Sequence, residues 1–380
     1  GGAEPLPLAE GTFTVTPGRP PDFLRISKRN PRYFEHADGR FFYPVGWAIA
    51  YPSDNPYGAN YVPYLPVENS LSIVKKMLDD LADAGGNLTR FWMADWWAGI
   101  EWNERVDNYG GIGRYNLKNA WLIDQVLERC EEKGIFMILE TLNHVRLNEG
   151  YSWPRNPYSR ANGGFLDLPQ HFWTHPAVPR LSENRLRYVV ARYADSPAIH
   201  SWHYMSEVDL VSERAWRQAQ DRVTASLEFV RRLDPYGHIV SNHVCHPASG
   251  FGLYERRAIE FIHSNAYGGL DLSEDQVAAV RDFSRMFDRY AKPVIIGEYA
   301  GCWQGDRAFK MERDTLGGLW AGVASRLSGT PLSWWWNFNY GEGLGRVYRH
   351  VSDFMAGEDL IVEDTAEKGG WRDRPVEVKS

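Results

Sequence analysis

The chain has 380 residues, of which 43% are hydrophobic, so it can bury one large core or two smaller ones. Its formal net charge is −7 and it contains no basic run, which argues against a nucleic-acid partner. Aromatic residues make up 14% of the chain, including 16 Trp and 20 Tyr. Flat rings with a polar edge fill cores and also suit the faces of sugars. Many of them fall in predicted loops, which favours the second use.

The cysteines and the hydropathy of the chain exclude further classes of protein. Cys130, Cys245 and Cys302 cannot all pair with one another and form no C-x-x-C motif, so we expect free thiols rather than a zinc centre or a disulfide framework. No apolar run approaches the roughly 18 residues of a membrane span, and no signal peptide is visible. We therefore expect no membrane partner. The oligomeric state and the compartment stay open, because secretion, the periplasm and the cytoplasm all fit the sequence.

The first 38 residues differ in character from the rest of the chain. Residues 1–38 are polar and rich in Pro, with one alternating stretch at 12–16. This pattern predicts a short β-containing lead-in, the remnant of a β-domain. A turn signal at 36–39 ends the lead-in. We expect a catalytic domain over 39–350 and a charged C-terminal tail over 351–380.

From residue 39 onward, short apolar runs alternate with amphipathic segments. The apolar runs predict strands buried on both faces, at 41–47, 87–93, 135–140, 199–205, 239–243, 260–265, 293–298 and 331–336. Apolar residues at helical spacing predict helices at 70–84, 119–133, 182–194, 212–233, 273–290 and 308–327. No dinucleotide-binding or P-loop glycine motif occurs. The alternation therefore predicts an α/β fold, a (β/α)8 barrel, with a long insertion at 141–180 of the kind that is usually functional.

Two of the predicted strands end at a glutamate. The strand at 199–205 runs into Ser206-Glu207, and the strand at 293–298 ends at Glu298. A (β/α)8 barrel carries its chemistry at the carboxyl ends of its strands, so the two carboxylates should meet across the barrel mouth. Paired carboxyl groups cleave glycosidic bonds, with retention at a separation of about 5–5.5 Å and inversion at about 6.5–9.5 Å. We expect the closer geometry.

These motifs resemble clan A of the glycoside hydrolases, the retaining (β/α)8 enzymes, over about residues 35–345. The stretch from Trp202 to Glu207 resembles the strand-four motif W-x-x-x-N-E, and Ile295-Ile-Gly-Glu298 resembles the strand-seven motif. The resemblance implies that Glu207 is the acid/base and Glu298 the nucleophile. The clan usually has Asn before the acid/base, where it holds the sugar 2-hydroxyl, whereas Ser206 stands here. This departure puts the substrate class and the level of activity in question.

The resemblance also implies several substrate-binding residues. Arg90 resembles the clan's arginine near the nucleophile, and Tyr267 resembles its strand-six tyrosine. Trp335 or Trp336 resembles the strand-eight aromatic platform. The lead-in resembles the junction between an N-terminal β-sandwich and the barrel in certain bacterial members. Arg90 has a structural alternative as the partner of a buried acid, because an unpaired buried guanidinium is costly.

Other candidates for substrate contacts follow the predicted strands. Trp96, Glu140, His144 and His243 come after the second, third and fifth strands. Each has a structural alternative: Trp96 as part of an apolar plug over the barrel, Glu140 and His144 as loop anchors, and His243 as hydrogen-bonded scaffold. The histidines at the strand ends fit no common metal-ligand spacing, so we expect neither a metal nor a cofactor.

The sequence thus favours a retaining hydrolase of β-glycosidic bonds in a poly- or oligosaccharide, with carbohydrate as its partner. Ser206 leaves a second hypothesis open, a catalytically weak or silent carbohydrate-binding barrel. A metal-dependent barrel hydrolase is a third class, and the lack of an H-x-H pattern on the first strand argues against it. The sugar, the linkage and the choice between endo and exo action are not predicted.

Overall fold

The computed structural model describes residues 22–52, 67–103, 105, 108–150, 152–267, 275–303 and 305–363. The predicted alternating stretch at 12–16 lies outside these residues. No helix in the described ranges is long and apolar enough to cross a membrane.

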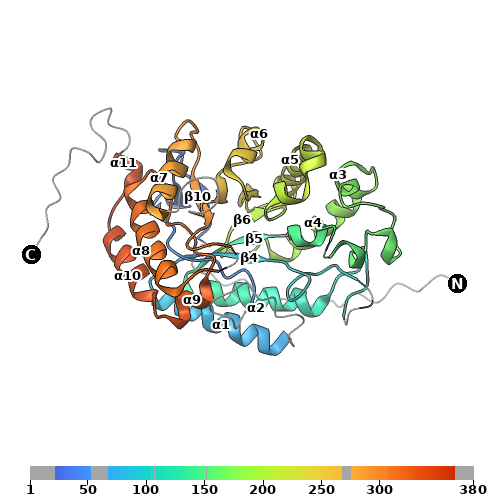
Figure 1. Ribbon diagram of the computed structural model, residues 1–380, viewed down its shortest axis with the longest axis horizontal. Coiled ribbons are helices and arrows are strands. Elements are labelled where there is room, and N and C mark those ends of the chain that lie inside the picture. The colour runs from blue at the N-terminus through green and yellow to red at the C-terminus, as the bar shows by residue number, and fades with distance from the viewer. Residues whose placement is uncertain are drawn as a thin grey trace, which may run out of the picture.

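Parallel strands lie at the centre of the molecule among the helices (Figure 1), and their pairings and bridges join them into a closed ring. The ring contains β4 (Leu88–Trp92), β5 (Phe136–Glu140), β6 (Ile199–His203), β7 (Ile239–Ser241), β8 (His243–Val244), β9 (Ile262–Asn265) and β10 (Val294–Glu298). The strands β4 to β7 pair in that order, as do β8 to β10, and one residue separates β7 from β8. Single parallel bridges complete the ring, from Gly46 to Leu88 and from Ser333 to both Trp47 and Tyr299. The predicted (β/α)8 barrel is confirmed.

Long helices cover the outside of the ring (Figure 1). They are α1 (Val67–Asp83), α2 (Leu117–Lys133), α4 (Val178–Tyr193), α5 (Trp216–Leu233), α7 (Gln276–Phe287), α8 (Ala308–Ala324) and α10 (Gly345–Met355). Capping residues in the local sequence determine where helices begin and end, as α2 illustrates. The side chain of Asn116 accepts a hydrogen bond from the first turn of α2, and Gly134 ends that helix at φ 68°. The helix α10 contacts both α8 and α1, and so closes the helical layer.

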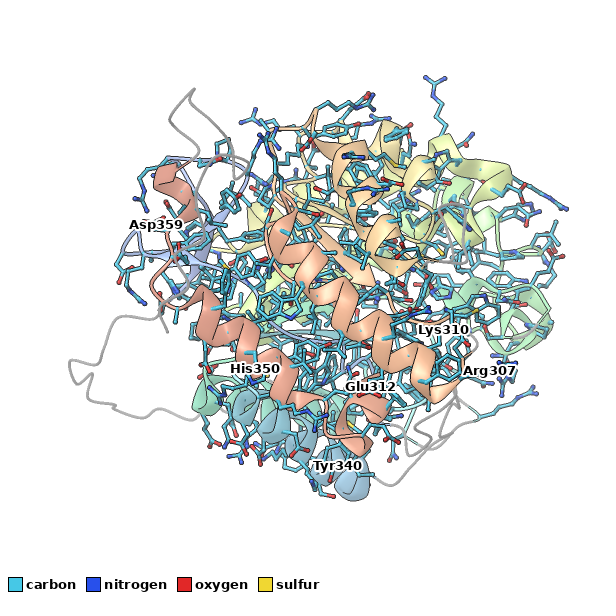
Figure 2. The ribbon with its side chains drawn as sticks, turned by 60° about the vertical axis from the view of Figure 1, so that its left-hand side comes forward. Arg307, Lys310, Glu312, Tyr340, His350 and Asp359 are labelled. Atoms are coloured by element: carbon cyan, nitrogen blue, oxygen red, sulfur yellow. The ribbon has the colours of Figure 1, made fainter. Side chains whose placement is uncertain are left out.

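The outer helices present polar side chains to solvent. Figure 2 shows α8 and α10 side by side, with Glu312 and His350 on their exposed faces. In the described part of the insertion at 141–180, only short helices precede α4, which begins at Val178. They are η1 (His144–Leu147), η2 (Trp153–Arg155), η3 (Arg160–Asn162) and α3 (His171–Thr174). Elsewhere in the described residues, short helices are α6 (Phe251–Tyr254), α9 (Trp336–Gly341) and α11 (Leu360–Glu363), with the single turns η4 (Val208–Val211), η5 (Glu213–Ala215) and η6 (Pro247–Gly250).

A small antiparallel sheet closes the amino-terminal end of the barrel. It consists of β1 (Leu24–Ile26), β2 (Phe34–His36) and β3 (Phe41–Phe42). Three of its side chains pack in one apolar cluster with side chains from the barrel strands: Leu24, Phe34 and Phe42 with Leu88, Ile138, Ile239, Phe261, Ile295 and Leu332. Because this end is plugged, the polar groups of the barrel interior have only the carboxyl end of the strands for chemistry.

Two predicted strands were wrong in their extent. The first was expected at 41–47, but 41–42 form β3, which pairs antiparallel with β2, and the chain joins the barrel only from Val45 onward, with backbone hydrogen bonds to β4 as far as Ala50. Pro44 lies between the two parts and has no N–H to donate to a ladder. The last was expected at 331–336, but only Ser333 bridges, and α9 begins at Trp336. Trp334, Trp335 and Trp336 therefore do not follow one another along a strand, and all three are buried.

Candidate active site

The buried guanidinium of Arg90 organises the carboxyl end of the barrel. Arg90 lies on β4 and is 0% exposed. Its Nε and Nη2 donate to the two carboxylate oxygens of Glu140 at 2.8 and 3.2 Å, and its Nη1 donates to Oε1 of Glu298 at 2.5 Å. Its Nη2 also lies 2.8 Å from Nδ1 of His243. Arg90 therefore combines both roles considered for it, since it pairs with a buried structural acid and contacts a strand-end glutamate.

Glu298 ends β10 and carries donors on both carboxylate oxygens. Besides the contact from Arg90, its Oε2 accepts a hydrogen bond of 2.9 Å from the hydroxyl of Tyr267. The preceding residue, Gly297, is required by packing, because a Cβ there would lie 2.5 Å from Nε2 of His263. A cation and a hydroxyl donor both favour the ionised carboxylate.

Glu207 follows β6 in a strained conformation. Its φ of 40° is in the left-handed region, which residues other than Gly rarely adopt and which is often found at functional sites. Its Oε1 accepts a hydrogen bond of 2.8 Å from Nδ2 of Asn265, and its Oε2 lies 3.3 Å from Nε2 of His144. Within the described part of the chain, no Arg or Lys forms an ion pair with Glu207. Its surroundings are thus less cationic than those of Glu298.

The two glutamates face each other. A carboxylate oxygen of Glu207 and one of Glu298 lie within 4.8 Å of each other, and the two residues are 8% and 3% exposed. Burial raises the pKa of both carboxyl groups, and the negative charge of Glu207 raises the pKa of Glu298 further. The pair therefore holds one proton near neutral pH. The charge of Arg90 lowers the pKa of both carboxyl groups, and only Glu298 also accepts hydrogen bonds from Arg90 and Tyr267, which favour its ionised form.

Ser206 stands where the resemblance led us to expect Asn, and its hydroxyl binds His144 rather than pointing at Glu207. The Oγ accepts from the backbone N–H of His144 at 3.2 Å and from Nδ2 of Asn143 at 3.4 Å. These contacts occupy its acceptor sites, so its own proton is directed to Nδ1 of His144, 3.0 Å away. Burial lowers the pKa of His144 to about 3, so the ring is neutral. With Nδ1 accepting, Nε2 carries the hydrogen and donates it to Glu207.

His243 acts as an internal connector. It is fully buried, and its Nε2 lies 2.7 Å from Oδ1 of Asn265, while its Nδ1 faces Arg90 and the backbone N–H of Glu207. One tautomer satisfies all three contacts, with the hydrogen on Nε2. Asn265 was not singled out from the sequence, although it ends the sixth strand two residues before Tyr267. That position at a strand end was the signal that could have identified it.

Aromatic rings surround the guanidinium. Trp334, which was not among the expected binding residues, lies with its ring centroid 5.9 Å from the Arg90 carbon, and Trp92 lies at 5.2 Å. Trp96 and Trp336 both contact the ring of Tyr51, at 5.5 and 5.0 Å. Trp335 points elsewhere, because its Nε1 donates to the backbone oxygen of Ala300 at 3.0 Å. Of the three consecutive tryptophans, Trp334 is the one placed over the charged centre.

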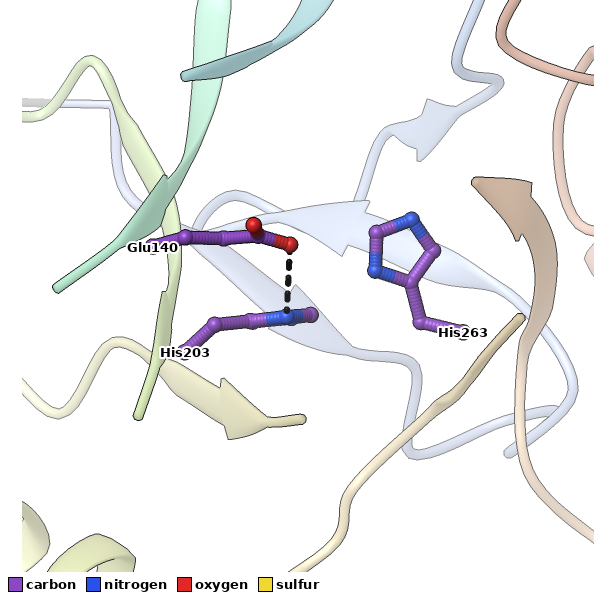
Figure 3. Close-up of side chains that lie close together, drawn as sticks. All are labelled: Glu140, His203 and His263. Atoms are coloured by element: carbon purple, nitrogen blue, oxygen red, sulfur yellow. Dashed lines mark ion pairs between the residues drawn. The ribbon is translucent and has the colours of Figure 1, made fainter. Parts of the chain in front are cut away.

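A layer of imidazoles lies next to these charges. Figure 3 shows Glu140 of β5, His203 of β6 and His263 of β9 converging, with Nδ1 of His203 3.8 Å from Glu140. Burial lowers the pKa of both histidines well below the usual value, so both rings are neutral. These three residues, like Glu207, His243 and Glu298, are grouped closely enough for a cation. Arg90 contacts a member of each group, however, so a divalent ion would meet the guanidinium charge at short range. Arg90 already supplies the counter-charge.

The fold and the site together define a class of protein, a (β/α)8 barrel with two facing glutamates at the carboxyl ends of its fourth and seventh strands. No family model matches the chain. Over 192 residues, it is 26% identical to a probable mannan endo-1,4-β-mannosidase F of Emericella nidulans, a match that covers 48% of this chain and 40% of that protein. The chain therefore spans less than half the length of this curated relative.

Solved structures share the barrel at lower identity. The endo-1,4-β-mannanase of Rhizomucor miehei superposes with a TM-score of 0.62 at 17% identity, covering 88% of this chain and all of that one. A family 5 glycoside hydrolase, a mannosidase from the same organism, superposes with a TM-score of 0.58 at 14% identity, covering 83% and 86%. At these identities the likeness establishes the fold.

Proposed function

We propose that this protein is a retaining glycoside hydrolase that cleaves β-linked polysaccharide, with Glu207 as acid/base and Glu298 as nucleophile. The observation that carries the proposal is the approach of the two carboxylates to within 4.8 Å, with one of them bound to Arg90. This separation lies on the retaining side, since inverting enzymes need about 6.5–9.5 Å to admit a water. The named relatives act on mannan, so β-1,4-mannan is the first substrate to test.

The chemistry divides between the two carboxyl groups. Glu207 donates its proton to the glycosidic oxygen while an oxygen of Glu298 bonds to the anomeric carbon, and the bond from that carbon to the leaving sugar breaks. In the second half, Glu207 accepts a proton from water. The water oxygen bonds to the anomeric carbon as the bond to Glu298 breaks. Two inversions restore the original configuration.

The remaining groups support these roles. Arg90 and Tyr267 hold Glu298 ionised and aim it, which keeps the nucleophile ready at neutral pH. Asn265 and His144 hold the two oxygens of Glu207. Ser206 fixes His144 and therefore does not take the place of an amide that would face the sugar 2-hydroxyl. We infer that the contact to that hydroxyl is absent or comes through His144, which is the specificity question to test.

The test is a hydrolysis assay on soluble β-1,4-mannan, cellulose and xylan derivatives, with the first product examined by proton NMR for its anomeric configuration. Retained configuration supports the proposal, and inverted product overturns it. Glu298→Gln should remove turnover, and Glu207→Gln should lower it by about 10²–10⁴-fold. Glu213→Gln is the matched control, because Glu213 is exposed and lies just beyond the site.

The alternative is a carbohydrate-binding barrel without catalytic activity, and it is motivated by Ser206 in place of the expected Asn. Calorimetry against the same polysaccharides separates the two. Binding without any release of reducing ends by the unaltered protein would overturn the hydrolase and favour the binding function. Azide adds a second check on Glu207→Ala with an activated aryl glycoside, because azide attacks the glycosyl-enzyme without needing a base. Restored turnover assigns Glu207 as the acid/base.

A further inference from the structure

A small enclosed cavity lies behind the active site, between the insertion at 141–180 and α4. Its polar lining comes from Glu101, Arg146, Asn156, Tyr158, Ser182 and Arg185. Every residue that lines it is at most 4% exposed. The space holds about one water-sized particle. It therefore admits a single small occupant and excludes a sugar, a phosphate or a carboxylate ligand.

Both arginines that line the cavity use only part of their N–H groups. Arg146 donates from Nη2 to the backbone oxygen of Glu101 at 2.6 Å, and Arg185 donates from Nη1 to the backbone oxygen of Thr141. Nε of Arg146 and Nη2 of Arg185 have no hydrogen-bond partner among the described residues. Unpaired donors on buried charged groups are costly, so they indicate an occupant that accepts hydrogen bonds.

Charge decides what that occupant is. The lining carries two guanidinium groups and a single carboxylate, that of Glu101. Glu101 lies 4.0 Å from Nε of Arg185, and its Oε1 is taken by the backbone N–H of Gly113 at 2.7 Å. The other acid that acts on Arg146 is Asp95, which forms no ion pair with it in the described structure. A water would satisfy the donors but add no negative charge to a lining in which two guanidinium groups face one carboxylate, Asp95 acts on Arg146 without an ion pair, and the Trp102 ring lies 4.8 Å from the Arg146 Cζ.

We propose that this cavity binds one monovalent anion of about the size of chloride, held by Arg146 and Arg185. The anion accepts from the two free N–H groups and offsets the second guanidinium charge. The site would also support the active centre. Arg185 holds the oxygen of Thr141, directly after Glu140, and Arg146 lies on η1 two residues after His144. Occupancy therefore stiffens the segment that presses His144 against Glu207.

Thermal unfolding of the full chain tests the proposal without any assay of activity. Sodium chloride is titrated against sodium gluconate at constant ionic strength, so that screening does not change. We expect a saturable rise in the unfolding midpoint of about 3 °C when chloride reaches 100 times its dissociation constant. For a chain of this length, the free energy of unfolding falls by about 0.8 kcal/mol per kelvin near the midpoint. A midpoint that is independent of chloride overturns the proposal.

Variants and a direct view of the ion sharpen the test. Arg185→Gln should abolish the chloride dependence, whereas Glu101→Gln should lower the dissociation constant at least severalfold, because it removes the opposing charge. Arg160→Gln is the control in the same insertion, where Arg160 makes an exposed pair with Asp167, and it should behave as the unaltered protein does. Bromide soaked into crystals of the unaltered protein should give an anomalous peak between Arg146 and Arg185. Water alone at that position refutes the site even if a variant fails to fold.

Discussion

Replacing Arg90 with Met should destabilise the protein by an amount that depends on pH. The change removes the guanidinium that pairs with Glu140 and Glu298, both of which are almost fully buried. Loss of one partner from a buried pair costs about 3–5 kcal/mol, because the remaining charge stays desolvated. The free energy of unfolding of a chain of this length falls by about 0.8 kcal/mol per kelvin near the midpoint, so a loss of 4 kcal/mol lowers the unfolding midpoint by about 5 °C. Scanning calorimetry at pH 7 measures it.

The pH dependence separates a lost charge from a lost contact. Burial already raises the folded-state pKa of Glu140 and Glu298 above the unfolded value of about 4.3, and loss of Arg90, whose charge lowers both, raises it further. A group with a raised folded pKa stabilises the folded state below the unfolded pKa, and that contribution is lost as pH rises. The cost of Arg90→Met should therefore be smaller at pH 5 than at pH 7.

The control is Arg129→Met, which removes the partly exposed pairs of Arg129 with Asp79 and Glu132. Pairs of this kind contribute about 0–1 kcal/mol, so we expect a small change that is the same at pH 5 and pH 7. A loss below 1 kcal/mol for Arg90→Met at pH 7, or a loss of equal size at both pH values, would refute the idea that Arg90 neutralises the buried carboxylates.

Tyr267→Phe removes the hydrogen-bond donor to Glu298 and should lower kcat/KM on the active polysaccharide by about 10–150-fold. The acidic limb of the pH–rate profile should move to higher pH, and a profile whose acidic limb does not move contradicts this prediction. His144→Leu should raise the pKa of Glu207 and move the alkaline limb upward, whereas His144→Gln keeps a donor near the position of Nε2 and should not. Carbon-13 NMR titration of labelled Glu side chains measures that pKa even if no substrate is found. Gly46→Ala places a Cβ 1.9 Å from a backbone oxygen of β4, so it should destabilise the barrel by at least 2 kcal/mol in denaturant titration.

The strained backbone conformation of Glu207 determines which hydrogen bonds its carboxyl group makes. Its left-handed φ turns the chain sharply after β6 and presents the carboxyl group to His144 and Asn265. Strain of this kind persists only where the surroundings hold it. The backbone N–H of Glu207 faces Nδ1 of His243, which is itself held by Arg90. One network therefore sets both the position of Glu207 and the charge of Glu298.

The sequence by itself determined the barrel and the two glutamates. Buried parallel strands read as continuous apolar runs, and a carboxylate directly after such a run must lie at the strand end, so local pattern was sufficient for Glu207 and Glu298. It was insufficient for the first and last strands of the ring. The first and last strands are irregular and join the ring through scattered backbone hydrogen bonds and single bridges, and the predicted first strand begins in β3, which belongs to the sheet that plugs the barrel.

Only the tertiary structure decided which side chains contact one another at the carboxyl end of the barrel. Arg90 lies 50 positions from Glu140 and 208 from Glu298, and nothing local links them. Likewise, the sequence showed that Ser206 replaces the expected Asn, but not that its hydroxyl would orient His144 toward Glu207. Side-chain hydrogen bonds across a barrel depend on which strands become neighbours and on their stagger, and these quantities are set by the closed ring rather than by any one segment.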